Sequence, residues 1–226
     1  MATAIIQARM SSKRLPNKVM KIINNKPLIT HVYERVKKSK KIKTIIVACS
    51  KSKTDDPLVK LCKIKKYKFF RGSLNNVLHR FVQASKKYNL KYFVRINGDS
   101  PCIDPAIIDK AIRLYENKRC DLVTNVYPRS YPAGISVEVI NSRIIYDVEK
   151  YKKITEKNKE HVTSYFYEHN KEYSIINFRN KKNCSNYNLA IDTLKHLKKI
   201  EQALRNKNFL DFTWKKILKL IYNYED

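Results

Sequence analysis

Short apolar runs alternate with amphipathic segments along the first half of this chain. Four runs rich in apolar and β-branched residues are expected to form strands, at residues 2–7, 44–49, 67–71 and 92–97. After Pro27, apolar residues recur at helical spacing at Leu28, Val32 and Val36. Such alternation is typical of a mostly parallel sheet that is covered by helices.

The second half of the chain repeats this pattern less regularly. Strands are expected at residues 122–126, 135–140, 173–178 and 187–191. Helices are expected near residues 142–151, 159–168, 194–204 and 214–221. In the first half, Ser73 is expected to cap one helix, and Asp104 with Pro105 to open another. Because no repeat, linker or low-complexity segment interrupts the chain, residues 1–226 are predicted to form a single α/β domain.

The strongest feature of the composition is a large positive charge. The 226 residues include 48 Lys and Arg against 20 Asp and Glu, which gives a formal net charge of +28. Such a charge favours nucleic-acid binding through phosphate neutralisation, and the 15 Tyr are available for base stacking. The basic residues are spread along the whole chain, however, and the joint enrichment in Lys, Asn, Ile and Tyr indicates a nucleotide bias of the genome. Nucleic-acid binding is kept as an alternative of a different class, and no nucleic-acid partner is expected.

Two further features of the sequence concern the cellular compartment. The chain has no apolar run of about 18 residues and no secretory cleavage pattern, so we expect a cytoplasmic protein with no membrane contact. The five cysteines lack the spacing of a zinc site or of a disulfide framework. They are expected to be reduced, mostly buried thiols.

The most informative chemistry lies near the start of the chain, where an apolar run breaks into a basic loop. This loop carries Arg9, Ser12, Arg14 and Lys18. Phosphate oxygens bind charge-assisted donors, for which Arg offers a planar fork and Lys a point charge. A helix after such a loop adds backbone N–H groups and a positive dipole end. We interpret the segment as a polyphosphate-binding loop, with a solvated basic loop as the alternative.

Two carboxylates are expected at the carboxyl ends of strands, where open α/β sheets bind ligands. Asp99 follows Gly98 directly after a strongly apolar strand, and Asp192 ends the strand expected at residues 187–191. Mg²⁺ prefers oxygen ligands and often reaches a protein through one or two carboxylates together with substrate phosphates. Both residues are therefore candidate magnesium ligands. The alternatives are a turn before Pro101 for Asp99 and a helix cap for Asp192.

Two segments further along the chain are candidates for contacting a second substrate. Gly134 precedes an expected strand that carries Glu138 on its polar face, which suits a polyhydroxylated molecule. A solvated sheet face is the alternative. Glu160 and His161 open a helical stretch, where they either contact substrate or occupy an ordinary first turn.

Four segments of the chain resemble the motifs of one enzyme family, and they lie at residues 5–18, 70–73, 95–101 and 160–163. Together they resemble the cytidylyltransferases, and within them the spore-coat polysaccharide biosynthesis type, which is related to the acylneuraminate and 3-deoxy-manno-octulosonate cytidylyltransferases. The resemblance implies a Rossmann-like nucleotide-diphospho-sugar transferase fold. It also implies transfer of CMP from CTP to a sugar or sugar-acid acceptor, with Mg²⁺ as cofactor and pyrophosphate as the second product. By analogy the protein is expected to be a homodimer, with residues 127–140 at the interface.

The resemblance further implies roles for individual residues. It assigns nucleotide binding to Gln7, Ala8, Arg9, Ser12, Arg14, Lys18, Arg71, Asn75, Asn76, Asn97 and Gly98. It assigns acceptor binding to Gly134, Glu138, Glu160 and His161. It assigns catalysis to Arg9, Lys18 and Asp99, and metal binding to Asp99 and, more weakly, to Asp192.

The chain departs from the family pattern in ways that leave the acceptor open. A second acidic residue usually follows Asp192 in relatives, whereas this chain continues with Thr193, Leu194, Lys195 and His196. Asn75, Asn76 and Ser136 are neutral here and often acidic in relatives. The acceptor is a nonulosonic or octulosonic acid, another sugar, or a small phosphonate. A glycosyltransferase of related architecture is the nearer alternative, but the basic first loop argues against it.

Overall fold

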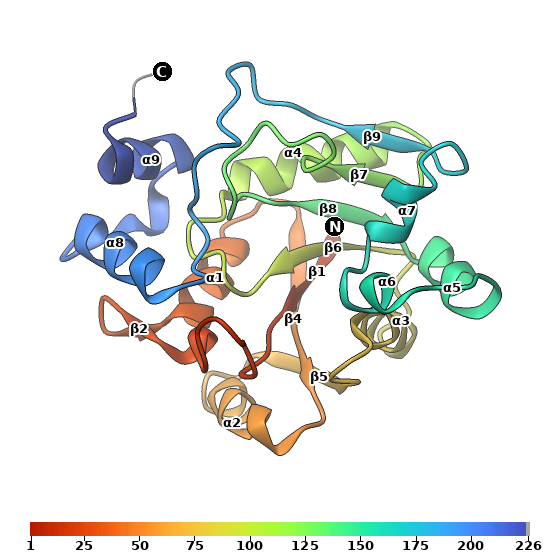
Figure 1. Cartoon of the computed structure of the whole chain (residues 1–226), viewed down its shortest axis with the longest axis horizontal. Helices are drawn as coiled ribbons and strands as arrows, with labels where there is room; N and C mark the ends of the chain where they lie inside the picture. The colour runs from red at the N-terminus through yellow and green to blue at the C-terminus, as the bar shows by residue number, and fades with distance from the viewer. Residues whose placement is uncertain (225–226) are drawn as a thin grey trace.

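A seven-stranded sheet forms the centre of the molecule (Figure 1). The computed structural model describes residues 1–224. In sheet order the strands are β5 (Lys68–Gly72), β4 (Ile42–Ser50), β1 (Ala2–Gln7), β6 (Tyr92–Asn97), β8 (Glu138–Asn141), β7 (Leu122–Thr124) and β9 (Ile175–Asn177). Strand β8 runs antiparallel to both of its neighbours, and the other pairings are parallel. The predicted mostly parallel sheet is confirmed.

Helices cover both faces of this sheet (Figure 1). One hydrophobic core joins the sheet to α1 (Leu28–Lys37), α2 (Asp56–Ile64), α4 (Pro105–Asn117), α8 (Leu194–Leu204) and α9 (Trp214–Tyr222). A second core joins the opposite face to α3 (Val77–Lys87), α5 (Ser142–Tyr151) and α7 (Ser164–Glu168), while α6 (Glu156–Glu160) lies against α3. The remaining short elements are β2 (Ile22–Ile23), β3 (Lys26–Pro27), η1 (Lys18–Met20), η2 (Lys53–Asp55) and η3 (Phe209–Asp211).

The apolar run of β1 explains why this strand lies in the middle of the sheet. Ala4 and Ile6 point into one core and Ile5 points into the other, and all three are fully buried. Successive side chains of a strand point to opposite faces, so an uninterrupted apolar run requires burial on both sides. Strand β1 is therefore held between β4 and β6, and its carboxyl end is fixed relative to theirs.

Three expected elements differ from the structure. The expected strand at 135–140 begins only at Glu138, because the Asn125 side chain satisfies the backbone before it: its Nδ2 donates to Ile135 O, and its Oδ1 accepts from Val137 N. The segment 187–191 is not a strand, and it contributes only an isolated bridge between Asn188 and Ala133. The helix expected at 159–168 is interrupted, and α6 and α7 are separate short helices.

The helix starts were predicted with mixed success. Asp104 caps α4 as expected, since its Oδ1 accepts from Ala106 N at 2.8 Å. Ser73 does not cap α3. The cap is Asn76, whose Oδ1 accepts from His79 N at 2.9 Å, while Ser73 Oγ accepts from Asn76 N. The Ser73 hydroxyl thus binds the backbone of the capping residue Asn76, and it does not bind the first turn of α3 itself.

The state of the cysteines matches the expectation of reduced, mostly buried thiols. All five cysteines are free thiols, and four of them are buried. Burial is the main cause that raises the pKa of the Cys49 thiol to about 11. Among residues 1–224, no helix has the length and apolar character needed to cross a membrane.

Candidate active site

The basic loop and Asp99 emerge side by side at one edge of the sheet. Strands β1 and β6 are parallel neighbours, and Gln7 at the end of one is paired with Asn97 at the end of the other. Gly98 N donates to Gln7 O at 2.8 Å, and a Cβ on Gly98 would lie only 2.8 Å from that oxygen. Glycine is needed here because any side chain would push the two strand ends apart. Strand pairing therefore brings together residues 9 and 99, which lie 90 positions apart in sequence.

Most of the predicted site residues line a single cavity of about 470 Å³ at this edge. From the first half of the chain it contains Gln7, Ala8, Arg9, Ser12, Arg14, Lys18, Asn97, Gly98 and Asp99. From the second half it contains Glu160, His161 and Asp192. The expectation that the amino-terminal cations and the aspartates converge is met by this cavity.

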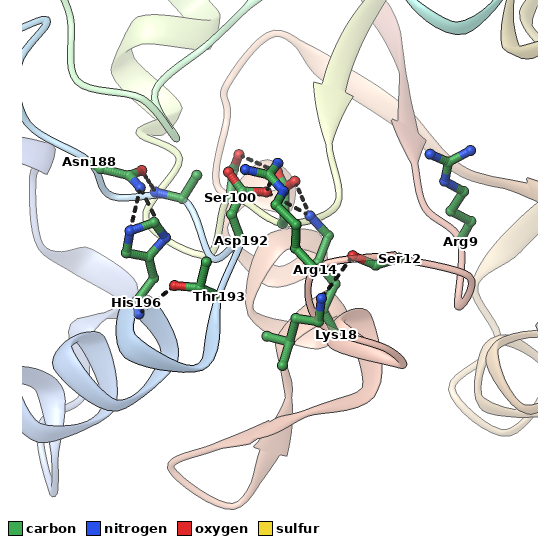
Figure 2. A network of polar contacts seen from close by, with 12 residues as sticks. Arg9, Ser12, Arg14, Lys18, Ser100, Asn188, Asp192, Thr193 and His196 are labelled. Carbon is green, nitrogen blue, oxygen red and sulfur yellow. Dashed lines mark hydrogen bonds and ion pairs between the residues drawn. The ribbon is translucent and has the colours of Figure 1, made fainter.

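Lys18 lies at the centre of the charged cluster. Its Nζ is 2.6 Å from Asp99 Oδ2 and 3.1 Å from Asp192 Oδ1, and Arg14 Nη2 is 2.9 Å from the same Asp192 oxygen. Figure 2 shows Arg14 and Lys18 pointing toward Asp192, with Arg9 set apart on the other side of the loop. The Lys18 side chain is only 14% exposed, so its ion pairs are screened less than surface pairs are.

Asp192 is placed by backbone contacts that the sequence did not reveal. Ile191 N donates to Asp99 O at 2.9 Å, which fixes Asp192 beside Asp99. The helix-cap alternative for Asp192 is not what the structure shows, because Thr193 is the cap of α8 and its Oγ1 accepts from His196 N. The Asp192 carboxylate is thus directed to the two cations and not to the helix.

Gly134 does not line the cavity, but it packs against the backbone of Leu189 and Ala190, just before Asp192. Its φ is +90°, and a Cβ there would lie 2.5 Å from the Leu189 carbonyl carbon and 2.6 Å from Ala190 N. Only glycine permits so close an approach in this conformation. Gly134 therefore lets the backbone before Asp192 pack against the centre of the molecule, and its predicted contact with the acceptor stays a prediction.

Arg9 and Glu160 form a separate ion pair across the cavity. Arg9 Nη2 lies 2.8 Å from Glu160 Oε1, and this hydrogen bond is the main cause that lowers the pKa of the Glu160 carboxyl. The break between α6 and α7 leaves His161 at the cavity wall next to this pair. Three cations of the basic loop are thus paired with carboxylates that lie far away in the sequence. Arg9 pairs with Glu160, Arg14 with Asp192, and Lys18 with Asp99 and Asp192.

Glu138 is buried and is one of the residues that line a second, smaller cavity. Its carboxylate accepts hydrogen bonds from Arg95, from Thr163 at 2.8 Å and from Tyr167. Burial and the neighbouring Glu138 charge raise the pKa of the Tyr167 hydroxyl well above its ordinary value, so this hydroxyl stays protonated and donates. Both oxygens of the Glu138 carboxylate are therefore occupied by hydrogen bonds within the protein.

Three residues predicted to bind nucleotide lie outside the 470 Å³ cavity. Arg71 donates to the carbonyl oxygens of Ser50 and Ser52 and pairs with Asp56 at 2.8 Å. Asn76 uses its side-chain oxygen as the cap of α3. Asn75 is exposed in the bend before that helix. Their contact with a nucleotide stays a prediction.

The basic loop is anchored by a residue that sequence reasoning missed. Asp55 is fully buried, and its two oxygens accept from Met10 N and from Ser50 N, each at 2.7 Å. The first bond holds the backbone of the loop just after Arg9, and the second holds the end of β4. In the sequence Asp55 is indistinguishable from an ordinary residue near a helix start, because it directly precedes Asp56 and Pro57.

Replacing Asp55 by Asn is expected to lower the free energy of unfolding by at least about 2 kcal/mol, because one of two buried N–H groups loses its charged acceptor. Burial lowers the pKa of the nearby Arg80 guanidinium to about 10, and the Asp55 charge opposes this, so the variant also removes a counter-charge. Urea unfolding measures the loss. The control is Asp56→Asn, whose side chain is 55% exposed. Equal midpoints for the two variants would contradict the anchoring role.

The pair of carboxylates around Lys18 fits a divalent cation. Asp99 and Asp192 each place an oxygen within 3.1 Å of the same ammonium group, so a cation already lies between them. Within the described part of the chain, no group of three or more His, Cys, Asp and Glu side chains could hold a metal ion. A metal between these two aspartates would complete its coordination with phosphate oxygens and water, as Mg²⁺ commonly does.

Comparison with known proteins agrees with this geometry. A sequence profile of the cytidylyltransferase family matches residues 3–219. The chain is 32% identical over 195 residues to the spore coat polysaccharide biosynthesis protein SpsF of Bacillus subtilis, covering 84% of this chain and 80% of that protein. It is also 32% identical over 119 residues to a 3-deoxy-manno-octulosonate cytidylyltransferase of Pelobacter propionicus, covering 49% of this chain and 43% of that protein.

A solved structure extends the likeness to the whole fold. The structure of a cytidylyltransferase from Leptospira borgpetersenii is 25% identical in sequence and superposes with a TM-score of 0.92, over 100% of this chain and 99% of that one. The family profile includes the basic loop, Asp99 and the greater part of the sheet. This chain therefore belongs to the cytidylyltransferase family of nucleotidyltransferases and has the Rossmann-like fold of that family.

Proposed function

We propose that this protein transfers CMP from CTP to a sugar or sugar-acid acceptor, with Mg²⁺ and with release of pyrophosphate, in the synthesis of a cell-surface polysaccharide or glycan precursor. One observation carries the proposal: Lys18 lies between Asp99 and Asp192 in a cavity that Arg9, Ser12 and Arg14 also line. The names of the relatives support the chemistry, since one is a 3-deoxy-manno-octulosonate cytidylyltransferase and another acts in spore coat polysaccharide biosynthesis.

The charge balance of the cavity supports a role for a divalent cation. Arg9, Arg14 and Lys18 are matched by carboxylates, so these ion pairs add little net positive charge for a polyanion. A triphosphate that enters must exchange partners with these carboxylates. Asp99 and Asp192 would then hold Mg²⁺, which when bound supplies charge neutralisation at the phosphate oxygens.

The basic side chains supply the rest of the electrostatic stabilisation. Released from their carboxylates, Lys18 and Arg14 bind the phosphates that leave as pyrophosphate, and Arg9 binds from the other side of the loop. The oxygen of an acceptor hydroxyl forms a bond to the α-phosphorus as its proton passes to water. The bond from this phosphorus to the oxygen that bridges to the β-phosphate breaks, and pyrophosphate leaves in line with the attacking oxygen. The reaction needs positioning and charge neutralisation more than covalent participation by the protein.

A pyrophosphate-release screen tests the proposed function. CTP, UTP, ATP and GTP are each incubated with the protein, Mg²⁺ and a panel of octulosonic acids, nonulosonic acids, neutral sugars and small phosphonates. We expect pyrophosphate only with CTP and an acceptor, and none when the metal is removed by chelation. Transfer from a preformed nucleotide sugar without pyrophosphate would favour the glycosyltransferase alternative. Salt-sensitive oligonucleotide binding without CTP consumption would favour the nucleic-acid alternative.

The homodimer expected from the family resemblance stays a prediction. Its expected interface at residues 127–140 includes the segment that forms one wall of the smaller cavity, through Arg129, Ser136 and Glu138. Light scattering of the purified chain measures the oligomeric state directly.

A further inference from the structure

A groove of about 720 Å³ lies away from the candidate active site, between the β2–β3 hairpin and the end of α8. Figure 1 shows this hairpin beside α8. The groove is lined by residues of the ranges 22–25 and 198–208 and is called the hairpin groove below. None of its lining residues also lines the 470 Å³ cavity. Cavities that bind small molecules typically enclose about 300 to 1,000 Å³, so the hairpin groove is large enough for a ligand of its own.

Hydrogen bonds from one asparagine hold the two walls of the hairpin groove together. Asn24 Nδ2 donates to Leu204 O at 2.6 Å and to Lys207 O at 3.2 Å. Asn24 and Asn25 have φ angles of 44° and 62°, and Asn206 on the opposite wall has a φ of 57°. Asparagine adopts this left-handed conformation more readily than most residues do, so both walls turn sharply without glycine. The shape of the groove is thus set by the protein's own contacts.

The hairpin groove carries an excess of positive charge. Lys198, Arg205 and Lys207 line it, against the single carboxylate of Glu201. All four residues are exposed, and within residues 1–224 none of the three cations forms an ion pair. In the candidate active site, by contrast, the cations of the basic loop are matched by carboxylates. The hairpin groove therefore attracts an anionic ligand without any exchange of ion pairs.

The spacing of two of these cations indicates an extended ligand. Lys198 lies within α8 and Arg205 is its C-cap, seven positions further on. The two residues therefore lie on one face of the helix, two turns or about 10 Å apart along its axis. A ligand with two acidic groups at a similar separation contacts both cations while their side chains stay extended. The geometry thus favours a chain of linked acidic units over a single small anion.

The uncharged groups of the hairpin groove favour a saccharide over a nucleic acid. The side chains of Asn25, Gln202 and Asn206 form no hydrogen bond within the described residues. A carboxamide both donates and accepts, as a hydroxyl does, so sugar hydroxyls can pair with both of its ends. Ile22 is 53% exposed and offers an apolar contact to the C–H face of a sugar ring. None of the described residues that line the groove is aromatic, whereas binding of single-stranded nucleic acid relies on aromatic stacking.

We propose that the hairpin groove binds an acidic oligosaccharide, whose carboxylates contact Lys198 and Arg205 and whose hydroxyls contact the carboxamides. This inference goes beyond the proposed cytidylyl transfer and does not depend on it, because the groove and the candidate active site share no lining residue. The groove is exposed to water, so its ion pairs with the ligand are screened. The affinity is therefore expected to be modest and to fall as the salt concentration rises.

Calorimetric titration with trigalacturonate, a linear saccharide with a carboxylate on every residue, tests the proposal. The parent protein is expected to bind it at low salt. The double variant Lys198→Gln/Arg205→Gln is expected to bind it about 5- to 30-fold more weakly, because two exposed ion pairs are lost. Gln202→Leu keeps every charge but removes one carboxamide, and it is expected to weaken binding about 2- to 10-fold. Maltotriose, a neutral saccharide of the same length, is expected to bind at least about tenfold more weakly than trigalacturonate.

The matched control is the double variant Lys195→Gln/Lys219→Gln. It removes the same two positive charges from exposed lysines of α8 and α9 that lie outside the hairpin groove. Its affinity for trigalacturonate is expected to stay within about twofold of that of the parent. The thermal unfolding temperature, measured for every variant, shows whether the protein stays folded.

Three outcomes would overturn the proposal. The first is absence of trigalacturonate binding by the parent, or equal binding by the parent and Lys198→Gln/Arg205→Gln. The second is an equal loss in the groove variant and in the control variant, which would show that only the net charge attracts the saccharide. The third is tighter binding of a hexathymidylate or of a hexaglutamate peptide in the groove, which would identify another class of ligand. Failure of the pyrophosphate-release screen would leave all these results unchanged, so the proposed function is tested separately.

Discussion

Asp99→Asn is expected to reduce CTP-dependent pyrophosphate release at least about a hundredfold while the protein stays folded. The substitution keeps the size of the side chain, and the hydrogen bond from Ser100 Oγ to Oδ1 can still form. It removes the negative charge that contacts Lys18 at 2.6 Å and that would hold the metal. The loss is therefore expected in the rate of transfer and in the metal concentration required, and not in the thermal unfolding temperature.

The matched control for Asp99 is Asp211→Asn. Asp211 also forms a lysine ion pair, with Lys38 at 2.7 Å, but its side chain is 64% exposed and lies outside the cavity. We expect normal pyrophosphate release from this variant. Normal release from a folded Asp99→Asn protein would show that Asp99 is not a metal or catalytic residue.

Lys18→Ala is expected to weaken the binding of CTP by about 10- to 100-fold. A charge-assisted hydrogen bond to phosphate is worth roughly 1.5 to 3 kcal/mol, which corresponds to one to two decades in affinity. The variant leaves Asp99 and Asp192 without their shared ammonium, so their combined negative charge still attracts a divalent cation. Titration of the variant with CTP at saturating Mg²⁺ measures the effect.

Two further variants make the Lys18 experiment specific. Lys18→Arg keeps a positive charge and is expected to retain part of the affinity. Lys21→Ala removes an exposed lysine three residues along the chain that lies outside the cavity, and it is expected to bind CTP normally. If Lys18→Ala and Lys21→Ala bound CTP equally well, Lys18 would be a surface residue without a role in the triphosphate site.

The sequence was informative where the position of a functional residue follows from the strand directly before it. The apolar runs of β1 and β6 identify strands buried on both faces, and the polar residues after them must emerge at the carboxyl edge of the sheet. This reasoning placed Arg9, Lys18 and Asp99 together, and the structure agrees. The prediction succeeded because parallel pairing of neighbouring strands leaves their carboxyl ends at one edge.

Sequence reasoning was weaker where a side chain replaces a regular backbone interaction. Asn125 satisfies the backbone at Ile135 and Val137, so the strand expected at 135–140 starts late. Asn76 caps α3 with a side chain that was assigned to the nucleotide. An asparagine side chain both donates and accepts hydrogen bonds, so it can cap a helix, bind backbone groups in place of a neighbouring strand, or bind a ligand. The local sequence does not distinguish among these three roles.

By itself the sequence determined the type of sheet, the basic loop at its edge and the identity of the charged groups, because burial and alternation are properties of consecutive residues. Only the tertiary structure decided which charges meet. The contact of Asp192 with Lys18 depends on a backbone hydrogen bond from Ile191 to Asp99, and the anchoring of the loop depends on Asp55. Such partnerships are set by distances between segments far apart in the chain, and no pattern of neighbouring residues records them.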